Sequence, residues 1–415
     1  MKKRYIWLLL LPLLCACDRG DNQFYDFSDL EGADPSAFSV YSTKVTELSK
    51  GLPPSALLPY DEVQTKTTST TINAILANLL EFNRKAEVIE LAGTYESWDY
   101  VSDKPTRLSG KVLLPKGRKP KRYILVSHYT IGSNAEAPSN CFPLEGVLCD
   151  LGYAMIFPDY EGYGVDVDRI HPYLVMEQTA SDVYRMYVAV KQFLKDTDYA
   201  PEHEDIYLMG FSQGGATTMA TQWLMEKLAG AGDEIRMVFA GGGPYDVRET
   251  YNTFITSNTV NIPAAIPFVI QGMIQGNRLD LNMQEILQPW LYDKLDEWIN
   301  SKLYSTSQLK SMIGTTKTSD MLTEIGMDRT SDQVSELYKA MSENSVLALD
   351  WVPQAPVYML HSMDDDVVPF INASKAKSKW ETANIQYNFG HYGSHQQCAL
   401  RFIYTVKTLL EEEGE

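Results

Sequence analysis

The chain has 415 residues, 44% of them hydrophobic, so it can bury a large core as one α/β domain with an insertion or as two modest domains. Its 36 basic and 54 acidic residues give a formal net charge of −18. A surface of this charge repels nucleic acid and anionic lipid headgroups, so a neutral or cationic ligand is expected.

The N-terminus has the pattern of a secretory signal. Residues 1–17, MKKRYIWLLLLPLLCAC, run from a basic start through an apolar stretch to a small residue before Cys17. This stretch is too short for a permanent membrane-spanning helix. Leu14–Cys17 resembles a bacterial lipobox, which implies cleavage before Cys17, lipidation of its thiol and anchoring to an envelope membrane. The alternative is an ordinary signal peptide that ends in cysteines. Residues 18–42 are interpreted as a tether.

Three further cysteines, Cys141, Cys149 and Cys398, would lie in an oxidising compartment. Cys141 and Cys149 are close enough in sequence to pair, which leaves at least one thiol free. No CxxC pair or zinc-ligand spacing is present, so a cysteine metal site is not expected.

Residues 43–85 resemble a helical lead-in, and from about Ala86 short β-rich runs alternate with longer amphipathic ones. This alternation predicts a mostly parallel sheet of eight strands flanked by helices. The predicted strands are Glu87–Gly93, Leu108–Leu114, Tyr123–His128, Ala154–Pro158, Asp205–Gly210, Met237–Gly241, Pro356–His361 and Ile385–Phe389. The predicted helices include Gln178–Lys195, Gly214–Leu228 and Gln396–Glu411. The first two strands lie too close for a crossover helix, which indicates an antiparallel edge hairpin.

More than a hundred residues separate Gly243 from Pro356, too many for a loop without structure of its own. We interpret residues 248–351 as a helical cap inserted between two parts of the core, 43–247 and 352–415. Helical periodicity favours helices at Met283–Leu303, Ser305–Ile313 and Ser331–Asn344. The apolar strip Val260–Ile274 lines a pocket or channel, or forms the cap's own core; the sequence leaves both open.

Ser212 is the candidate nucleophile. It lies in Gly-Phe-Ser-Gln-Gly, between a predicted strand and a predicted helix, the context that gives this motif its meaning in α/β hydrolases. The serine of such a turn has a strained backbone, and Gly210 and Gly214 keep Cβ atoms away from the crossing chain. The amide of Gln213, at the start of the helix, is placed to donate to a developing oxyanion.

A serine needs a base and a carboxylate that orients it, and in this fold they follow in the order Ser, Asp, His. The strand Pro356–His361 is followed by Ser-Met-Asp-Asp-Asp-Val-Val-Pro. A pattern His-small-x-x-Asp-x-x-Val-Pro, frequent in the superfamily, selects Asp365, with Asp366 as the alternative acid and Asp364 as a loop charge.

The base is expected just after the last strand, where two histidines compete. His395 precedes the closing helix with Ser394 as a plausible N-cap, whereas His391 lies closer to the strand end. His395 is favoured because Gly-Ser-His before a helix resembles relatives whose base opens the terminal helix, and His391 remains the alternative. The second oxyanion donor is expected near Tyr129 or Thr130, in the turn after Tyr123–His128.

Together, Ser-His-Tyr-Thr-x-Gly-Ser, Pro-Asp-Tyr-x-Gly-Tyr-Gly, Gly-Phe-Ser-Gln-Gly-Gly and the helical insertion resemble secretory lipases of the lipase A type and their bacterial relatives, over about Ala86 to Leu410. The resemblance implies an α/β-hydrolase fold and an esterase or lipase with a helical lid. It also implies a triad of Ser212, Asp365 and His395 and no metal or organic cofactor.

Three other functions remain as alternatives: a serine peptidase without a propeller, a carbohydrate esterase, and a non-catalytic lipoprotein of the envelope that binds glycan or lipid. The sequence does not distinguish an esterase from a peptidase. It also does not determine the acyl-chain length of the substrate or the oligomeric state of the protein.

Overall fold

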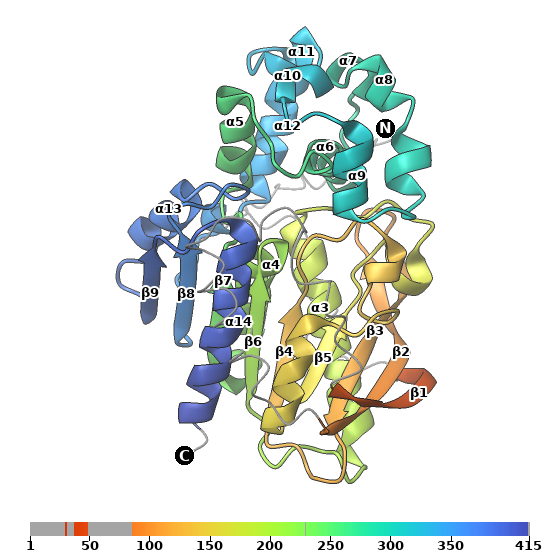
Figure 1. The fold of residues 1–415 in the computed structure, drawn as a ribbon, viewed down its shortest axis with the longest axis vertical. Coiled ribbons are helices and arrows are strands. Elements are labelled where there is room, and N and C mark those ends of the chain that lie inside the picture. The colour runs from red at the N-terminus through yellow and green to blue at the C-terminus, as the bar shows by residue number, and fades with distance from the viewer. Residues whose placement is uncertain (1–29, 31–36, 49–84, 229, 414–415) are drawn as a thin grey trace, which may run out of the picture.

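The computed structural model describes residues 30, 37–48, 85–228 and 230–413. Cys17, the signal and most of the predicted helical lead-in lie outside these residues. The described chain forms one nine-stranded sheet in the order β1-β2-β3-β5-β4-β6-β7-β8-β9 (Figure 1). The strands are β1 Ser39–Glu47, β2 Glu87–Asp99, β3 Lys104–Pro115, β4 Tyr123–Ser127, β5 Ala154–Pro158, β6 Ile206–Phe211, β7 Ile235–Gly241, β8 Val357–Ser362 and β9 Ile385–Gly390.

All eight predicted strands are present, and the mostly parallel α/β-hydrolase architecture is confirmed. The pairs from β5 through β4, β6, β7 and β8 to β9 are parallel, whereas β1, β2, β3 and β5 pair antiparallel. The predicted antiparallel hairpin is β2 with β3. The prediction was wrong about Thr43–Glu47, which belongs to β1 and not to a helix, and the tether prediction likewise included Ser39–Ser42 of this strand.

Each face of the sheet packs against its own helices, because side chains of a strand alternate between the two faces. Leu125, Leu208 and Val238 face a core shared with α3 Met176–Lys195 and α4 Gln213–Lys227. Ile124, Met209 and Phe239 face a second core with α14 His395–Glu412. α13 Ile371–Lys379 follows β8, and short 3-10 turns lie at Asn134–Glu136, Leu144–Leu151, Gly164–Asp166 and Gly232–Glu234.

The cap gathers at the end of the molecule where the parallel strands finish (Figure 1). It contains α5 Val247–Ser257, α6 Ala265–Gly276, α7 Met283–Ile286, α8 Pro289–Tyr292, the π-helix Leu295–Asn300, α9 Thr306–Ile313, α10 Thr318–Met321, α11 Glu324–Met327, α12 Asp332–Glu343 and a turn at Val346–Ala348.

The single helix predicted over Met283–Leu303 was wrong: three short pieces replace it. Leu287 leaves the helix to form an isolated β-bridge with Leu322, and Gln288 is extended. Pro289 disfavours helical geometry in the residue before it and is suited to begin a helix, so α8 starts there.

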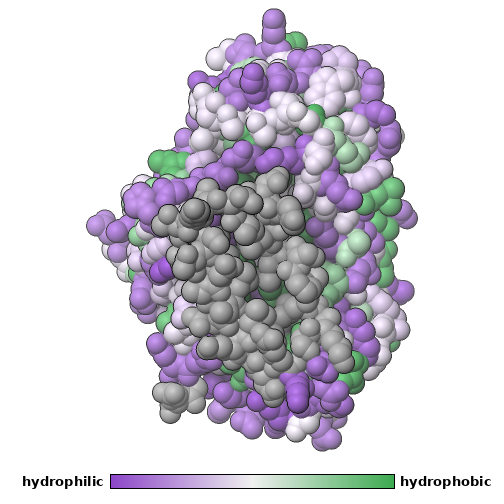
Figure 2. Space-filling view, viewed as in Figure 1, coloured by the Kyte–Doolittle hydropathy of each residue, from purple (hydrophilic) through white to green (hydrophobic). Residues whose placement is uncertain are grey.

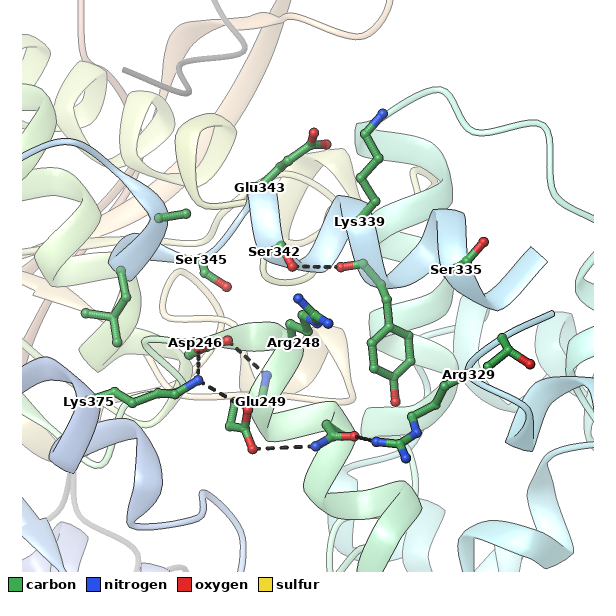
Figure 3. Close-up of a pocket in the computed structure, with 15 residues that line it drawn as sticks. Asp246, Arg248, Glu249, Arg329, Ser335, Lys339, Ser342, Glu343, Ser345 and Lys375 are labelled. Carbon is green, nitrogen blue, oxygen red and sulfur yellow. Dashed lines mark hydrogen bonds and ion pairs between the residues drawn. The ribbon is translucent and has the colours of Figure 1, made fainter. Parts of the chain in front are cut away.

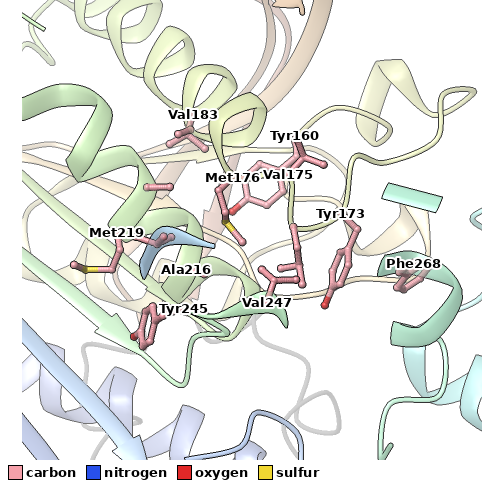
Figure 4. Packing of buried hydrophobic residues seen from close by; sticks show 14 of the residues in the cluster. Tyr160, Tyr173, Val175, Met176, Val183, Ala216, Met219, Tyr245, Val247 and Phe268 are labelled. Carbon is pink, nitrogen blue, oxygen red and sulfur yellow. The ribbon is translucent and has the colours of Figure 1, made fainter. Parts of the chain in front are cut away.

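The cap and the core share one hydrophobic interior. Tyr173 and Val175 of the loop before α3, Ala216 of α4, Val247 of α5 and Phe268 of α6 belong to a single buried cluster (Figure 4). In the view of Figure 2 the outer surface of the cap is mostly hydrophilic. Among the described residues no helix is both long and apolar enough to cross a membrane.

Candidate active site

Ser212 lies on a sharp turn between β6 and α4, as predicted. Its φ of 60° and ψ of −127° are strained values for a residue other than glycine, and its amide donates to the carbonyl of Gly241 at 2.9 Å. The neighbouring chain leaves no room for side chains in this turn. A Cβ on Gly210 would collide with the carbonyl of Gly214, and one on Gly214 with the carbonyl of Ser127. The two glycines therefore permit the strand, the turn and the helix to approach closely.

Of the three consecutive aspartates after β8, two contact His395 in different ways. Asp365, whose side chain is fully buried, accepts a hydrogen bond of 2.7 Å from His395 Nδ1 through Oδ2. Its Oδ1 accepts from the amides of Val367 and Val368 at 2.9 and 2.8 Å. Asp366 Oδ1 instead accepts from the backbone amide of His395 at 3.0 Å. The acid favoured from the sequence therefore contacts the favoured imidazole, and its neighbour anchors the first turn of α14.

The surroundings of Asp365 stabilise its ionised form. Burial alone would raise its pKa, but the charge and hydrogen bond of His395, together with His361 and the amide of Val367, bring the pKa below its usual value. A carboxylate in this state can orient His395 and stabilise a positive charge on it.

His395 is buried beneath the cap and packs on Phe211, with ring centroids 4.8 Å apart. Its Nδ1 is occupied by Asp365, whereas its Nε2 is buried and has no hydrogen-bond partner among the described residues. Both His395 and Ser212 line the same cavity. The free nitrogen is therefore the one available to a hydroxyl or to a substrate in that cavity.

His391 lies elsewhere. Its side chain is 76% exposed, and its Nδ1 donates to Asp364 Oδ1 at 2.9 Å. The carboxylate of Asp364 is itself half-exposed. The structure thus brings Ser212, Asp365 and His395 together and leaves His391 hydrogen-bonded to Asp364 at the surface.

The predicted oxyanion donors surround Ser212. Gln213 is the first residue of α4, where amide groups have no acceptor within the helix. Thr130 lines both cavities that touch Ser212, and its hydroxyl lies 2.8 Å from the hydroxyl of Tyr173. Tyr129 lines only the more open of these cavities.

Sequence reasoning missed a residue that holds Gln213. The side-chain amide of Gln213 donates to Nε2 of His171 at 2.8 Å, and His171 Nδ1 donates to the carbonyl of Glu161 at 2.8 Å. Burial lowers the pKa of His171 to about 3, so the ring is neutral and can accept. No local pattern indicates this contact, because it joins segments separated along the chain.

The acidic residues of the Pro-Asp-Tyr turn have structural contacts. Asp159 is buried and accepts from Ser109 Oγ at 2.6 Å, and Oε1 of Glu161 lies 2.7 Å from Nη2 of Arg169. Among the described residues no group of His, Cys, Asp or Glu side chains is arranged to hold a metal ion.

The three cysteines of the core, Cys141, Cys149 and Cys398, are all free, so the pairing considered for Cys141 and Cys149 was wrong. The thiol of Cys149 instead donates to the carbonyl of Tyr153.

A sequence model of the secretory lipase family matches residues 143–406, well over half of the chain. The chain belongs to the secretory lipase family. This secretory lipase is accordingly a carboxylic ester hydrolase, and membership of a secretory family indicates an extracellular or envelope location.

Solved structures agree with this fold. A rice cell wall degrading esterase, LipA from Xanthomonas oryzae, is 22% identical with a TM-score of 0.68, over 81% of this chain and 92% of that one. A putative hydrolase from Legionella pneumophila is 17% identical with a TM-score of 0.70, over 82% and 94%. Lipase A from Candida antarctica is 15% identical with a TM-score of 0.53, over 86% and 77%. A comparison with curated protein sequences gave no match.

Two cavities of different character meet at Ser212 of this lipase. One has a volume of about 30 Å³, and its wall includes Tyr251 and Phe254 of α5 and Val269 of α6. The other has a volume of about 190 Å³ and is bordered by Phe211, His395 and α14. The apolar strip Val260–Ile274 serves both purposes considered for it: Ile262, Ala265 and Val269 line the smaller cavity, and Ile266 and Ile270 fill the cap core.

Proposed function

We propose that this lipase hydrolyses esters through an acyl-enzyme on Ser212, with His395 as the base and Asp365 as the acid that orients it. His395 Nε2 takes the proton of Ser212 as its oxygen attacks the ester carbonyl, and then returns a proton to the departing alcohol. A water molecule activated by the same nitrogen then hydrolyses the acyl-enzyme and releases the carboxylic acid product. The observation that carries this proposal is the 2.7 Å contact of Asp365 with His395 Nδ1, which leaves a buried, unpartnered Nε2 beside the cavity of Ser212.

The oxyanion of the tetrahedral intermediate accepts from the amide of Gln213 and from a group of Tyr129 or Thr130. The position of Gln213 at the start of α4 supports the first donor, since the helix dipole also favours negative charge there. The proximity of Thr130 to both cavities supports the second.

We infer a preference for short acyl groups. The smaller cavity is walled by the cap, and its volume of about 30 Å³ is close to that of a single water molecule. Even an acetyl group is somewhat larger than one water molecule, so the shortest acyl groups require the least rearrangement, whereas a long chain would force α5 and α6 apart. The alcohol portion occupies the larger, more open cavity, from which it can leave.

Ser212→Ala tests the nucleophile. The variant should lose hydrolysis of p-nitrophenyl acetate and labelling by a fluorophosphonate probe while its circular dichroism is retained. Ser307→Ala, on an exposed position of α9, is the matched control and should behave as wild type. Turnover retained by purified Ser212→Ala would refute the assignment.

A series of p-nitrophenyl esters from C2 to C16 then measures the acyl preference. The proposed preference for short acyl groups would be wrong if the longest chains gave the highest kcat/KM.

The lipid anchor on Cys17 belongs to the same proposal. The lipobox-like end of the signal supports it, and an anchor would hold an acidic enzyme at the envelope facing its substrate. Incorporation of labelled palmitate into the wild-type chain, and its loss in Cys17→Ala with release of the protein from membranes, is the expected result. An unlabelled wild-type chain would show that the signal is an ordinary one.

A further inference from the structure

A wide, open cavity lies outside the proposed active site. It has a volume of about 940 Å³ and lies between α5, α12, the loop before α12 and Lys375 of α13 (Figure 3). This size is typical of sites for small organic ligands. Helix α5 separates it from Ser212: Tyr251 and Phe254 line the small cavity at Ser212, while Arg248 and Asn252 line this one.

The charges on its wall do not cancel. Lys375 Nζ forms ion pairs with Asp246 and Glu249, at 2.8 and 3.2 Å, so this one cation is paired with two carboxylates. Three further cations, Arg248, Arg329 and Lys339, face a single remaining carboxylate, Glu343. The wall as a whole therefore carries four cations and three carboxylates, a net charge of +1 in a chain of net charge −18.

Two of these cations are available to a ligand. Arg248 forms no hydrogen bond or ion pair with any described residue, and Figure 3 shows its guanidinium in the space between α5 and α12. Arg329 donates to the side chain of Asn252 through Nη1 at 2.6 Å, and a guanidinium has four further N–H donors. Planar guanidinium groups bind the oxygens of carboxylates and phosphates in pairs.

A buried hydroxyl supplies the second, independent indication. Tyr338 of α12 is 7% exposed, and its hydroxyl is buried without a hydrogen-bond partner among the described residues. Burial raises the pKa of this hydroxyl to about 12, the positive charges of Arg329 and Arg248 act in the opposite direction, and the charge of Glu249 adds to the rise. A buried donor without an acceptor is costly, and an acceptor on a ligand would satisfy it.

We propose that this cavity is a second binding site, for an organic anion whose carboxylate, sulfate or phosphate oxygens are bound by Arg248 and Arg329 and accept a hydrogen bond from Tyr338. The site is independent of the catalytic proposal, because none of its residues contacts Ser212, Asp365 or His395. Ser212→Ala should therefore bind the anion as tightly as wild type, so failure of either proposal can be distinguished from failure of the other.

Isothermal titration calorimetry of the full chain at low ionic strength tests the site with glucuronate, inorganic phosphate and sulfate, and with methyl glucoside as the uncharged probe. Glucuronate should bind at one site and methyl glucoside should not. Tight binding of phosphate and sulfate as well would indicate that the oxyanion alone is recognised; binding of glucuronate only would indicate that the sugar ring contributes. Either result supports the site.

Variants then locate the binding. Arg248→Gln and Arg329→Gln should each weaken it about tenfold, as expected for loss of one charge-assisted contact. Tyr338→Phe should weaken it about fivefold without lowering the thermal midpoint, because the hydroxyl has no partner in the protein. Arg107→Gln, an exposed position of β3 outside the cavity, is the matched control and should change nothing. The proposal is overturned if no anion binds, if methyl glucoside binds as well as glucuronate, or if Arg107→Gln weakens binding as much as Arg248→Gln.

Discussion

Replacing Asp365 by asparagine tests the proposed acid and base without changing the shape of the site. Oδ1 of Asp365 accepts from the amides of Val367 and Val368, and Oδ2 accepts from His395 Nδ1. In Asp365→Asn the carbonyl oxygen must remain on the two backbone donors, so the new NH₂ group faces His395 Nδ1. That nitrogen can then only accept, which moves the ring proton to Nε2.

This tautomer cannot act as a base toward Ser212, because the nitrogen beside the serine already carries its proton. The same change in a serine protease triad lowers kcat by about 10⁴-fold, and we expect a loss of that order in kcat/KM here. The corresponding rise in activation free energy is about 5.5 kcal/mol. Combining Asp365→Asn with His395→Ala should add little, since the two residues act as one unit.

The assay is kcat/KM for p-nitrophenyl acetate, with circular dichroism as the check of folding. Asp364→Asn is the matched control: it alters the neighbouring aspartate, which pairs with the exposed His391, and should change kcat/KM by less than about twofold, as expected for an exposed ion pair. Asp366→Asn removes the charge of the alternative acid, while its carbonyl oxygen can still accept from the His395 amide, so it should keep most of the activity. The reasoning is refuted if Asp365→Asn retains a tenth of the activity, or if Asp364→Asn loses as much as Asp365→Asn.

Three further predictions concern stability and specificity. Gly214→Ala should lower the free energy of unfolding in urea by about 3 kcal/mol, because its Cβ meets backbone, whereas Gly314→Ala, in open space at positive φ, should cost about 1 kcal/mol; equal losses would contradict this. Burial and the charge of Asp182 raise the pKa of Glu161 above its value in the unfolded chain, so its contribution to stability is full below about pH 4 and is lost as the pH rises. Glu161→Gln should therefore lose less stability than wild type between pH 5 and pH 8, and an unchanged slope in urea titrations would disprove it. Val269→Ala should enlarge the small cavity and shift the optimum of the p-nitrophenyl ester series to longer acyl chains; an unshifted optimum would place the acyl group elsewhere.

The strands of the core were predictable because each of them shows a recognisable residue pattern of its own. Ala154–Pro158 is an apolar run bounded by turn residues, and Ile206–Phe211 leads directly into the glycine-rich turn of Ser212. β1 was missed because most of its side chains are exposed and no apolar alternation marks it. It is a strand because it pairs with β2, a contact that the local sequence does not record. The periodicity over Met283–Leu303 was likewise overridden by a tertiary contact, the bridge of Leu287 with Leu322.

The order of the candidate catalytic residues was predictable, and the sequence favoured His395 but left His391, four positions earlier, as an alternative. Which imidazole reaches Asp365 depends on where α14 begins, and the amide of His395 is fixed by Asp366. Ser362 Oγ adds a second link across the same loops by donating to the carbonyl of Gly393 at 2.7 Å. These contacts join the ends of β8 and β9, so only the folded sheet brings them together.

The core and the cap contribute different groups of residues to the proposed active site. The residues proposed for catalysis come from the ends of core strands, where parallel strands and helix termini fix them with backbone contacts, whereas the walls of the cavities come largely from the cap. α5 contributes to both kinds of wall: Tyr251 and Phe254 limit the space beside Ser212, and Arg248 and Asn252 face the charged cavity behind it. Substitutions in the cap can therefore alter which esters are accepted while leaving the Asp365–His395 pair intact.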